Sequence, residues 1–253
     1  MRHESDKKLL GKTAVITNGC DGMGLATARL FAKEGAHIVI TTNSDKSFDR
    51  AQQAYGDHFM IRKVDLTDIE EIEQFAHEVK KRHSKVDILC AYGGSPRFCP
   101  LDRTSEKFYD YVFNSNVKGL FFTAKQIAPL MTGGGTIILG SSFLNNKAIA
   151  GSSVYAASQA AVLSLAKTLA VELIPKNIRV NALSPGFMDQ VVFDRMGVTT
   201  EDFAKEVPLG RLPQVEEIAR AALFLGSTDS SYILGTELVV DGGCSPVLAS
   251  QTA

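Results

Sequence analysis

The sequence has no tryptophan, few cysteines and no excess of charge of either sign. Its four cysteines, Cys20, Cys90, Cys99 and Cys244, are too scattered to form a metal-binding pair or a disulfide framework. The 27 basic residues nearly balance the 28 acidic ones, so the chain lacks the positive surface that attracts nucleic acid or an anionic membrane. We therefore expect reduced thiols, no metal site, and neither nucleic acid nor membrane as a partner.

Long apolar runs are also absent. The first twelve residues, MRHESDKKLLGK, are charged and contain no apolar core of the kind that a signal peptide has. No run of about 18 apolar residues indicates a membrane-spanning helix. With 253 residues and an apolar fraction of 45%, the chain is long enough to bury a large core. These features favour a cytoplasmic protein of one domain.

Short β-branched runs alternate with amphipathic segments along the whole chain. The runs predict strands at residues 12–17, 37–42, 58–64, 86–94, 134–142, 178–186 and 236–243. The segments between them predict helices at residues 24–35, 48–56, 68–83, 105–131, 152–173 and 214–226. Such alternation is typical of an α/β protein in which helices cover both faces of a parallel sheet. We therefore predict a doubly wound, Rossmann-type sheet of about seven strands in a single domain spanning residues 1–253.

The segment ITNGCDGMGLATA, residues 16–28, places three glycines between the first predicted strand and the first predicted helix. In a doubly wound sheet, ligands bind at the loops that leave the carboxyl ends of the strands. Glycines there let a pyrophosphate approach the backbone amides at the helix N-terminus. Gly19, Gly22 and Gly24 therefore indicate a dinucleotide site, although a glycine-rich turn that binds nothing would have the same pattern.

The next two loops bear on which dinucleotide binds. An acid after the second strand would hold the ribose 2′-hydroxyl of NAD(H), but the sequence there reads Thr42, Asn43, Ser44, which favours NADP(H). Against this, we expect no arginine to hold a 2′-phosphate, and Asp21 in the first loop would oppose one, so NAD(H) stays open. After the third strand, Asp65 could accept a hydrogen bond from the adenine amino group or simply cap the next helix.

From about residue 9 to residue 245, the order of motifs resembles that of the short-chain dehydrogenase/reductase family. The family's Thr-Gly-x-x-x-Gly-x-Gly pattern falls on residues 17–24. Its active-site asparagine, in an Asn-x-x-Gly context, falls on Asn116. Its serine falls on Ser142, and its tyrosine falls on Tyr155, thirteen residues later. No single motif is specific, but together they are, and the ending SSYILGTELVVDGG also resembles that of the family.

The resemblance implies two sets of site residues. The catalytic set is Asn116, Ser142, Tyr155 and Gln159. The cofactor-binding set is Thr17, Asn18, Gly19, Asp21, Gly22, Met23, Gly24, Thr42, Asn43, Ser44, Asp65, Leu66, Gly93, Tyr155, Gln159, Pro185, Gly186 and Met188. It also implies NADP(H) or NAD(H) as the cofactor, and a homotetramer or homodimer as the assembly.

Four positions depart from the family pattern. Asn18 replaces the first glycine of the fingerprint, which is a mild change because asparagine tolerates a positive φ better than most residues. Residues 91–94 read AYGG where the family has Asn-Asn-Ala-Gly, and Gln190 stands where a threonine usually follows Pro-Gly. The tyrosine of AYGG could contact substrate or fill the space that the asparagines leave. The largest departure is Gln159, which stands where the family has lysine.

That glutamine predicts the direction of the reaction. In the family's mechanism the tyrosine hydroxyl is the acid for carbonyl reduction and the base for alcohol oxidation, and lysine stabilises the tyrosinate. Free tyrosine has a pKa of about 10, and Gln159 can bond to ribose hydroxyls but supplies no charge. We therefore predict an oxidoreductase that favours reduction, with Tyr155 as proton donor and Ser142 polarising the substrate oxygen. Asn116 would hold a relay water, or would be a buried asparagine bonded to backbone.

The substrate end is expected around a lid at residues 187–208. Its apolar side chains predict a bulky, apolar carbonyl or alcohol substrate, unless they are ordinary packing: Phe98, Phe143, Phe187, Phe193 and Met196. Two other functions stay open. A catalytically impaired relative with a binding or regulatory role is favoured by Gln159. A lyase that resembles the halohydrin dehalogenases would use arginine at that position and no cofactor.

Overall fold

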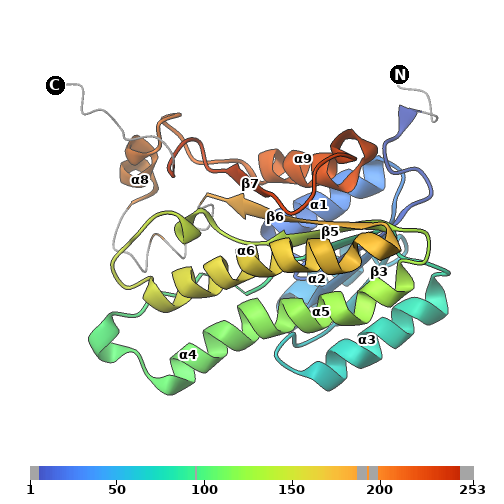
Figure 1. The fold of residues 1–253 in the computed structure, drawn as a ribbon, viewed down its shortest axis with the longest axis horizontal. Coiled ribbons are helices and arrows are strands. Elements are labelled where there is room, and N and C mark those ends of the chain that lie inside the picture. The colour runs from blue at the N-terminus through green and yellow to red at the C-terminus, as the bar shows by residue number, and fades with distance from the viewer. Residues whose placement is uncertain (1–5, 95, 187–192, 194–198, 246–253) are drawn as a thin grey trace.

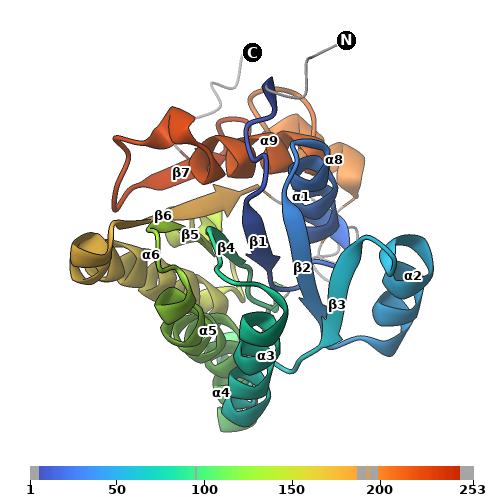
Figure 2. The same ribbon diagram turned by 90° about the vertical axis from the view of Figure 1, so that its right-hand side faces the viewer.

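The computed structural model describes residues 6–94, 96–186, 193 and 199–245. Its centre is a seven-stranded parallel sheet in the order β3-β2-β1-β4-β5-β6-β7 (Figure 2). The strands are β1 (Thr13–Ile16), β2 (His37–Thr42), β3 (Phe59–Lys63), β4 (Ile88–Ala91), β5 (Gly135–Gly140), β6 (Ile178–Pro185) and β7 (Glu237–Val240). All seven predicted strands are present, so the predicted fold class is confirmed.

Helices cover both faces of the sheet (Figure 1). They are α1 (Gly22–Lys33), α2 (Asp45–Tyr55), α3 (Ile69–Arg82), α4 (Glu106–Phe113), α5 (Gly119–Ile127), α6 (Ser153–Leu173), α8 (Thr200–Glu206) and α9 (Val215–Gly226). Only α8 has no counterpart among the predicted helices. It falls inside the segment expected to form a lid. Residues 187–192 and 194–198 of that segment lie outside the described residues, so the lid stays a prediction.

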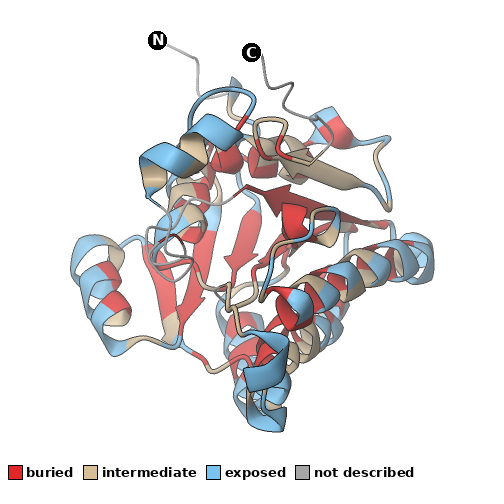
Figure 3. Cartoon of the chain, turned by 90° about the vertical axis from the view of Figure 1, so that its left-hand side faces the viewer, coloured by how far each residue is buried: buried red, intermediate tan, exposed pale blue. Residues whose placement is uncertain are grey.

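The core is divided by the sheet into two layers because successive strand residues point to opposite faces. In β1, Ala14 and Ile16 pack with Phe31 of α1, in a cluster that also includes residues of α2 and α9. Val15, between them, packs on the other face with residues of α3, α5 and α6. The central strands β1 and β4 are therefore buried on both sides, whereas β7 at the edge is only partly buried (Figure 3), as expected for a parallel sheet under two helical layers.

The predicted long helix at residues 105–131 is confirmed, since residues 106–130 are helical throughout, but its geometry is not uniform. A π-helical turn, η3 (Asn114–Lys118), separates α4 from α5, and a 3₁₀ turn follows α5. The π-helical turn is followed by a tight contact, because a Cβ on Gly119 would lie 2.6 Å from the backbone oxygen of Leu66. Glycine is required there for α5 to approach that loop. The same turn carries Asn116, which gives the Asn-x-x-Gly spacing a structural reason.

One described helix, residues 153–176, is long and apolar enough to cross a membrane by length and composition alone. A helix that covers the sheet of a soluble protein passes the same test, so this is weak evidence for a span. Here Val162 and Ala166 are fully buried in the core beneath α6. We interpret α6 as a covering helix of the sheet, and its first turns border the site described next.

Candidate active site

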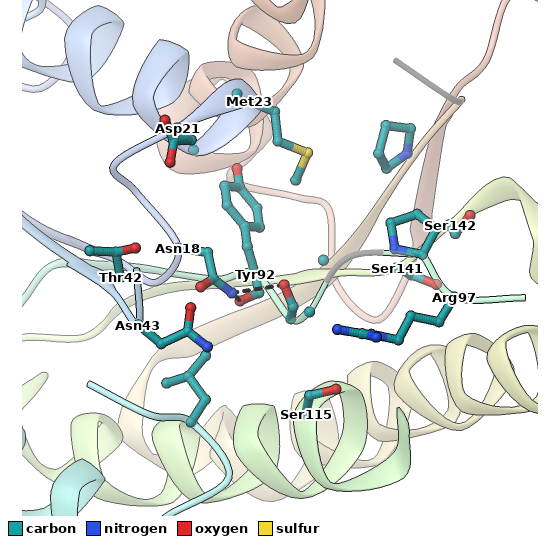
Figure 4. Close-up of a pocket in the computed structure, with 18 of the residues that line it drawn as sticks. Asn18, Asp21, Met23, Thr42, Asn43, Tyr92, Arg97, Ser115, Ser141 and Ser142 are labelled. Atoms are coloured by element: carbon teal, nitrogen blue, oxygen red, sulfur yellow. Dashed lines mark hydrogen bonds between the residues drawn. The ribbon is translucent and has the colours of Figure 1, made fainter. Parts of the chain in front are cut away.

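A cavity of about 830 Å³ lies beyond the carboxyl ends of β1, β4, β5 and β6 (Figure 4). The strand order reverses between β1 and β4, which is where ligands bind in doubly wound sheets. Most of the predicted site residues line this cavity: Asn18, Asp21, Gly22, Met23, Gly24, Thr42, Asn43, Ser44, Asp65, Leu66, Gly93, Ser142, Tyr155, Gln159, Pro185 and Gly186. Residues from distant parts of the sequence therefore meet in one place.

Three predicted residues lie behind the cavity wall. Thr17 is buried, and its hydroxyl donates to the carbonyl of Tyr92 at 2.8 Å and accepts from the amide of Tyr92 at 2.7 Å. Gly19 packs against Ile40, where a Cβ would come within 2.6 Å. Asn116 is also buried behind the wall, and Met188 lies outside the described residues. Thr17, Gly19 and Asn116 therefore shape the site without lining it.

Asn18 adopts the left-handed conformation expected at the first position of the glycine-rich loop. Its φ is +49°, and its Nδ2 donates to the carbonyls of Tyr92 at 2.9 Å and Gly93 at 2.8 Å. The side chain thus ties the loop after β1 to the loop after β4, a link that glycine could not make. Gly24 must stay glycine, because a Cβ there would lie 2.2 Å from the Asn18 carbonyl oxygen.

The N-terminus of α1 is open to an anion. Asp21 stands at its N-cap position but makes no side-chain cap hydrogen bond. By contrast, Ser44 caps α2 and Asp68 caps α3 through side-chain oxygens. Because the first amides of a helix need partners and carry partial positive charge, uncapped amides beside a cavity suit a pyrophosphate. The residues present therefore fit a dinucleotide cofactor at this end.

The adenosine end contains an arginine that the sequence analysis missed. Arg50, in the second turn of α2, pairs with Asp21 at 2.6 Å. The sequence analysis did not foresee this pair, and the expectation that no arginine holds a 2′-phosphate stays a prediction. The pairing depends on how α2 packs against the first loop. Because the two residues are 29 positions apart in the sequence, no local pattern predicts it. The negative charge of Asp21 is partly offset at this position.

Asp65 is not the cap of α3, because Asp68 fills that position and accepts from the amides of Glu70 and Glu71. One Asp65 oxygen accepts from the amide of Thr67 at 2.8 Å and from its hydroxyl at 2.9 Å. The carboxylate is thus fixed by its own loop on the cavity wall. This geometry excludes the helix-cap role, and adenine recognition by Asp65 stays a prediction.

The catalytic end is buried and uncharged at the tyrosine. Tyr155, in the first turn of α6, has an exposed fraction of 5%. Burial raises the pKa of Tyr155 to about 12, and the hydrogen bond with Ser142 opposes this rise. Gln159, one turn later, is 4% exposed, and its Nε2 donates to Ser158 Oγ at 3.3 Å. The tyrosine is therefore a neutral acid over the physiological pH range.

Asn116 links the loop after β4 to α6. Its Oδ1 accepts from the amide of Gly94 at 3.0 Å, and its Nδ2 donates to Ser158 Oγ at 3.0 Å. Ser158 Oγ in turn donates to the Tyr155 carbonyl at 2.7 Å. Ser158 therefore joins the amides of Asn116 and Gln159 to the turn that carries the tyrosine. Asn116 is a positioning residue in this arrangement.

The aromatic residues near the site are mostly packing. Tyr92 is buried, its hydroxyl lies 3.4 Å from the Thr27 hydroxyl, and it also lines the cavity, so both expected roles stay open. Phe143 and Phe193 are fully buried and do not line the cavity. Phe98 packs near Tyr155, with ring centroids 6.1 Å apart. Phe187 and Met196 lie outside the described residues. The three described side chains pack in one apolar cluster with Tyr155, and the predicted apolar substrate pocket stays a prediction.

Polar residues that the sequence analysis missed line the catalytic end: Arg97, Tyr111, Ser115 and Ser141. Two of them follow β4 and β5, so the rule that ligands bind at carboxyl strand ends could have found them. The other two lie on α4 and η3, which the rule does not cover. Among the described residues, no group of three His, Cys, Asp or Glu side chains is arranged to hold a metal ion.

Comparison with known proteins gives consistent matches over nearly the whole chain. A family model described as enoyl-(acyl carrier protein) reductase matches residues 19–245. An oxidoreductase of Sarocladium schorii is 36% identical over 95% of this chain and 98% of its own length. A 3-oxoacyl-[acyl-carrier-protein] reductase of Thermotoga maritima is 35% identical over 93% and 98%. An NAD-dependent glycerol dehydrogenase of Listeria innocua is 35% identical over 95% and 96%.

Solved structures agree with these matches. A short chain dehydrogenase/reductase family protein superposes with a TM-score of 0.85 at 33% identity, covering 95% of this chain and 100% of its own. A short-chain type dehydrogenase/reductase from Mycobacterium marinum gives a TM-score of 0.88 at 28% identity, covering 96% and 100%. These names support an oxidoreductase and give no support to the regulatory and lyase alternatives.

Proposed function

Because this chain belongs to the short-chain dehydrogenase/reductase family of NAD(P)-dependent oxidoreductases, we propose that it reduces a ketone or related carbonyl compound. The observation that carries the proposal is Tyr155. It borders the cavity and is hydrogen-bonded to Ser142. Burial raises the pKa of Tyr155 to about 12, which keeps the hydroxyl neutral. A neutral phenol can donate a proton but is a poor base near pH 7.

Two of the chain's own residues, Ser142 and Tyr155, act on the substrate oxygen. A nicotinamide cofactor held in this cavity would supply the hydride for the carbonyl carbon. Ser142 donates a hydrogen bond to the carbonyl oxygen and so stabilises the charge that develops there. Tyr155 transfers its hydroxyl proton to the same oxygen, which gives the alcohol. Bulk water then returns a proton to the tyrosinate.

Gln159 stands where the family has a lysine, so this position offers hydrogen bonds but no positive charge. Its amide lies one turn from Tyr155 and lines the cavity, so it can bond to a ribose hydroxyl. It does not stabilise tyrosinate as a cation would. Reduction does not need tyrosinate as a reactant, so the loss of charge hinders oxidation more than reduction. The proposed direction of catalysis rests on this asymmetry.

The experiment is a paired titration followed by an assay. NADH and NADPH are titrated into the wild type and Gln159→Lys, and both proteins are then assayed for NAD(P)H oxidation on a panel of ketones. Binding and turnover by the wild type are expected. Binding restored only by the lysine variant, or binding without turnover of any carbonyl, would contradict the proposal and point to an impaired relative.

For the cofactor, we propose NADP(H). Support comes from the absence of a carboxylate at Thr42, Asn43 and Ser44, and from Arg50, which offsets the charge of Asp21. The test is the ratio of the NADPH and NADH dissociation constants. A tighter constant for NADH would overturn this choice and leave the reaction class unaffected.

For the assembly and location, we propose a homotetramer in the cytoplasm. Exposed apolar side chains on α5 and α6, Phe121 and Val171, offer a surface for subunit contact. The four cysteines are free thiols, which suits a reducing compartment. Light scattering after size-exclusion chromatography measures the assembly, and a monomer at micromolar concentration would refute it. Fractionation of cells tests the location.

A further inference from the structure

A single positive charge stands on the wall of the cavity, counted over the residues that the structure describes. It belongs to Arg97, in the loop after β4. The other charged groups on the described wall are Asp21 and Asp65. In Figure 4, Arg97 lies with Ser141 and Ser142, whereas Asp21 lies with Thr42 and Asn43 on the far side. The cation is therefore at the catalytic end and the carboxylates are at the adenosine end.

Tyr111 of α4 holds this arginine in place. The guanidinium carbon of Arg97 lies 4.3 Å from the centroid of the Tyr111 ring, and Nη2 lies 3.2 Å from the Tyr111 hydroxyl oxygen. No carboxylate among the described residues pairs with Arg97, whereas Asp21 is paired with Arg50. A stacked guanidinium keeps its charge and leaves most of its donors free. Its in-plane donors are thus available to a ligand.

Neither the tyrosine nor the cofactor phosphates account for this charge. Burial and the hydrogen bond with Ser142 are the two causes that set the pKa of Tyr155, and Arg97 is not among them. The pyrophosphate is expected at the uncapped N-terminus of α1, beside Gly22 and Gly24, rather than beside Ser141. The nicotinamide of a reduced cofactor and its ribose carry no negative charge, so the remaining group at the catalytic end that could pair with Arg97 belongs to the substrate.

We propose that the substrate is an oxo-acid, whose carboxylate is bound by Arg97 while its ketone oxygen faces Ser142 and Tyr155. Guanidinium and carboxylate groups match in a two-point hydrogen-bonded geometry, which makes arginine selective for this group. The inference rests on the proposed carbonyl reduction and narrows its substrate class. It is an alternative to the expected bulky apolar substrate, and it rests on the cation that Arg97 places on the described wall.

The test compares oxo-acids with their primary amides, which have nearly the same shape but no charge. Acids with the carboxylate one to four carbons from the ketone are assayed with NADPH or NADH. For at least one pair, we expect kcat/KM of the acid to be about 10- to 100-fold above that of the amide. In Arg97→Met the preference should disappear, mainly through a higher KM. In Arg97→Lys part of it should remain, since an ammonium group keeps the charge without the fork.

The control is Arg103→Met. Arg103 is an exposed arginine of the 3₁₀ turn Leu101–Arg103 and does not line the cavity. Its removal changes net charge equally and should leave the ratio of acid to amide unchanged. An equal loss of the ratio in both arginine variants would overturn the assignment, because the effect would then come from net charge.

Calorimetric binding of the acid in the presence of dinucleotide separates the two proposals. Binding of the acid that Arg97→Met abolishes, without reduction of any ketone, would support the carboxylate site and refute the proposed reaction. Ketone reduction with a ratio near one in wild type and Arg97→Met would refute the carboxylate site and support the reaction. A preference confined to a phosphate ester such as dihydroxyacetone phosphate would also refute the carboxylate assignment.

Discussion

The two ends of the cavity differ in the charge and the exposure of their side chains. At the adenosine end, Asp21 and Arg50 form an ion pair with side chains that are 52% and 60% exposed. At the catalytic end, Tyr155 and Gln159 are almost completely buried and uncharged. Water screens an exposed pair, whereas a buried polar group depends on its protein partners. In this chain, burial keeps Tyr155 protonated, and position 159 carries no cation that would oppose this.

The largest effect is expected from Tyr155→Phe, which removes the proton donor and keeps the ring. General acid catalysis contributes about 10²- to 10⁴-fold, so kcat/KM for ketone reduction should fall by that factor. Dinucleotide affinity should change little. Tyr109→Phe is the control, since Tyr109 is an exposed residue of α4 that stacks on Phe113. Loss of activity by less than threefold in the first variant would show that another group donates the proton.

The next effect concerns alcohol oxidation and its dependence on pH. Because burial raises the pKa of Tyr155 to about 12, only a very small fraction of it is ionised at pH 7, and this fraction rises tenfold per pH unit. Oxidation by the wild type should therefore keep rising from pH 7 to pH 10. Gln159→Lys should lower the pKa of Tyr155 and raise oxidation at pH 7 by about tenfold or more.

Gln159→Met, which is neutral and similar in length, serves as the control for that lysine. Its oxidation profile should rise over the same pH range as that of the wild type. Steady-state rates with a secondary alcohol measure all three proteins. If the wild-type rate levels off near pH 8, the high pKa of the tyrosine is refuted.

A smaller effect is expected from Ser158→Ala. The change removes the oxygen to which Asn116 and Gln159 donate, at 3.0 and 3.3 Å, and leaves two buried amides short of a partner. The free energy of unfolding should fall by about 1–3 kcal/mol, measured by urea denaturation. Ser164→Ala, at an exposed position of α6, should change it by less than about 0.5 kcal/mol. Equal stability of the two variants would mean that the network is not important.

The smallest effect on stability is expected at the exposed end. Asp21→Asn breaks the pair with Arg50, and such surface pairs contribute about 0–1 kcal/mol. The released arginine should favour NADPH over NADH by a few fold, measured by fluorescence titration. Asp229→Asn removes an exposed partner of Lys8 away from the cavity and should leave that preference unchanged. A shift toward NADH in Asp21→Asn would contradict the proposed role of Arg50.

The sequence predicted the elements better than the contacts between them. β2 (His37–Thr42) and α6 (Ser153–Leu173) match their predicted ranges to within a residue, since β-branched runs and helical periodicity are local signals. The π-turn at Asn114–Lys118 was missed because hydrophobic periodicity does not distinguish a π-turn from the α-helix around it; in the structure the turn lies beside the close contact of Gly119 with Leu66. Local patterns report which element forms, and the site also depends on where elements meet.

The same reason explains the two arginines. Arg50 and Arg97 each acquire a role from one contact, with Asp21 and with Tyr111, on another part of the chain. Such contacts carry no sequence spacing that repeats from protein to protein. Asn18 is the opposite case: its tolerance for a positive φ was predicted from residue type alone, and the structure confirms it at +49°.

The most direct test of the account is the pH profile of ketone reduction by the wild-type enzyme. If a buried Tyr155, without a cation at Gln159, is the proton donor, kcat/KM should stay level from pH 6 to pH 10, because the donor remains protonated throughout. A rate that falls tenfold per pH unit above an apparent pKa near 7 would contradict this. The donor would then be ionised in the neutral range, and hydrogen bonding by Gln159 could not explain the site.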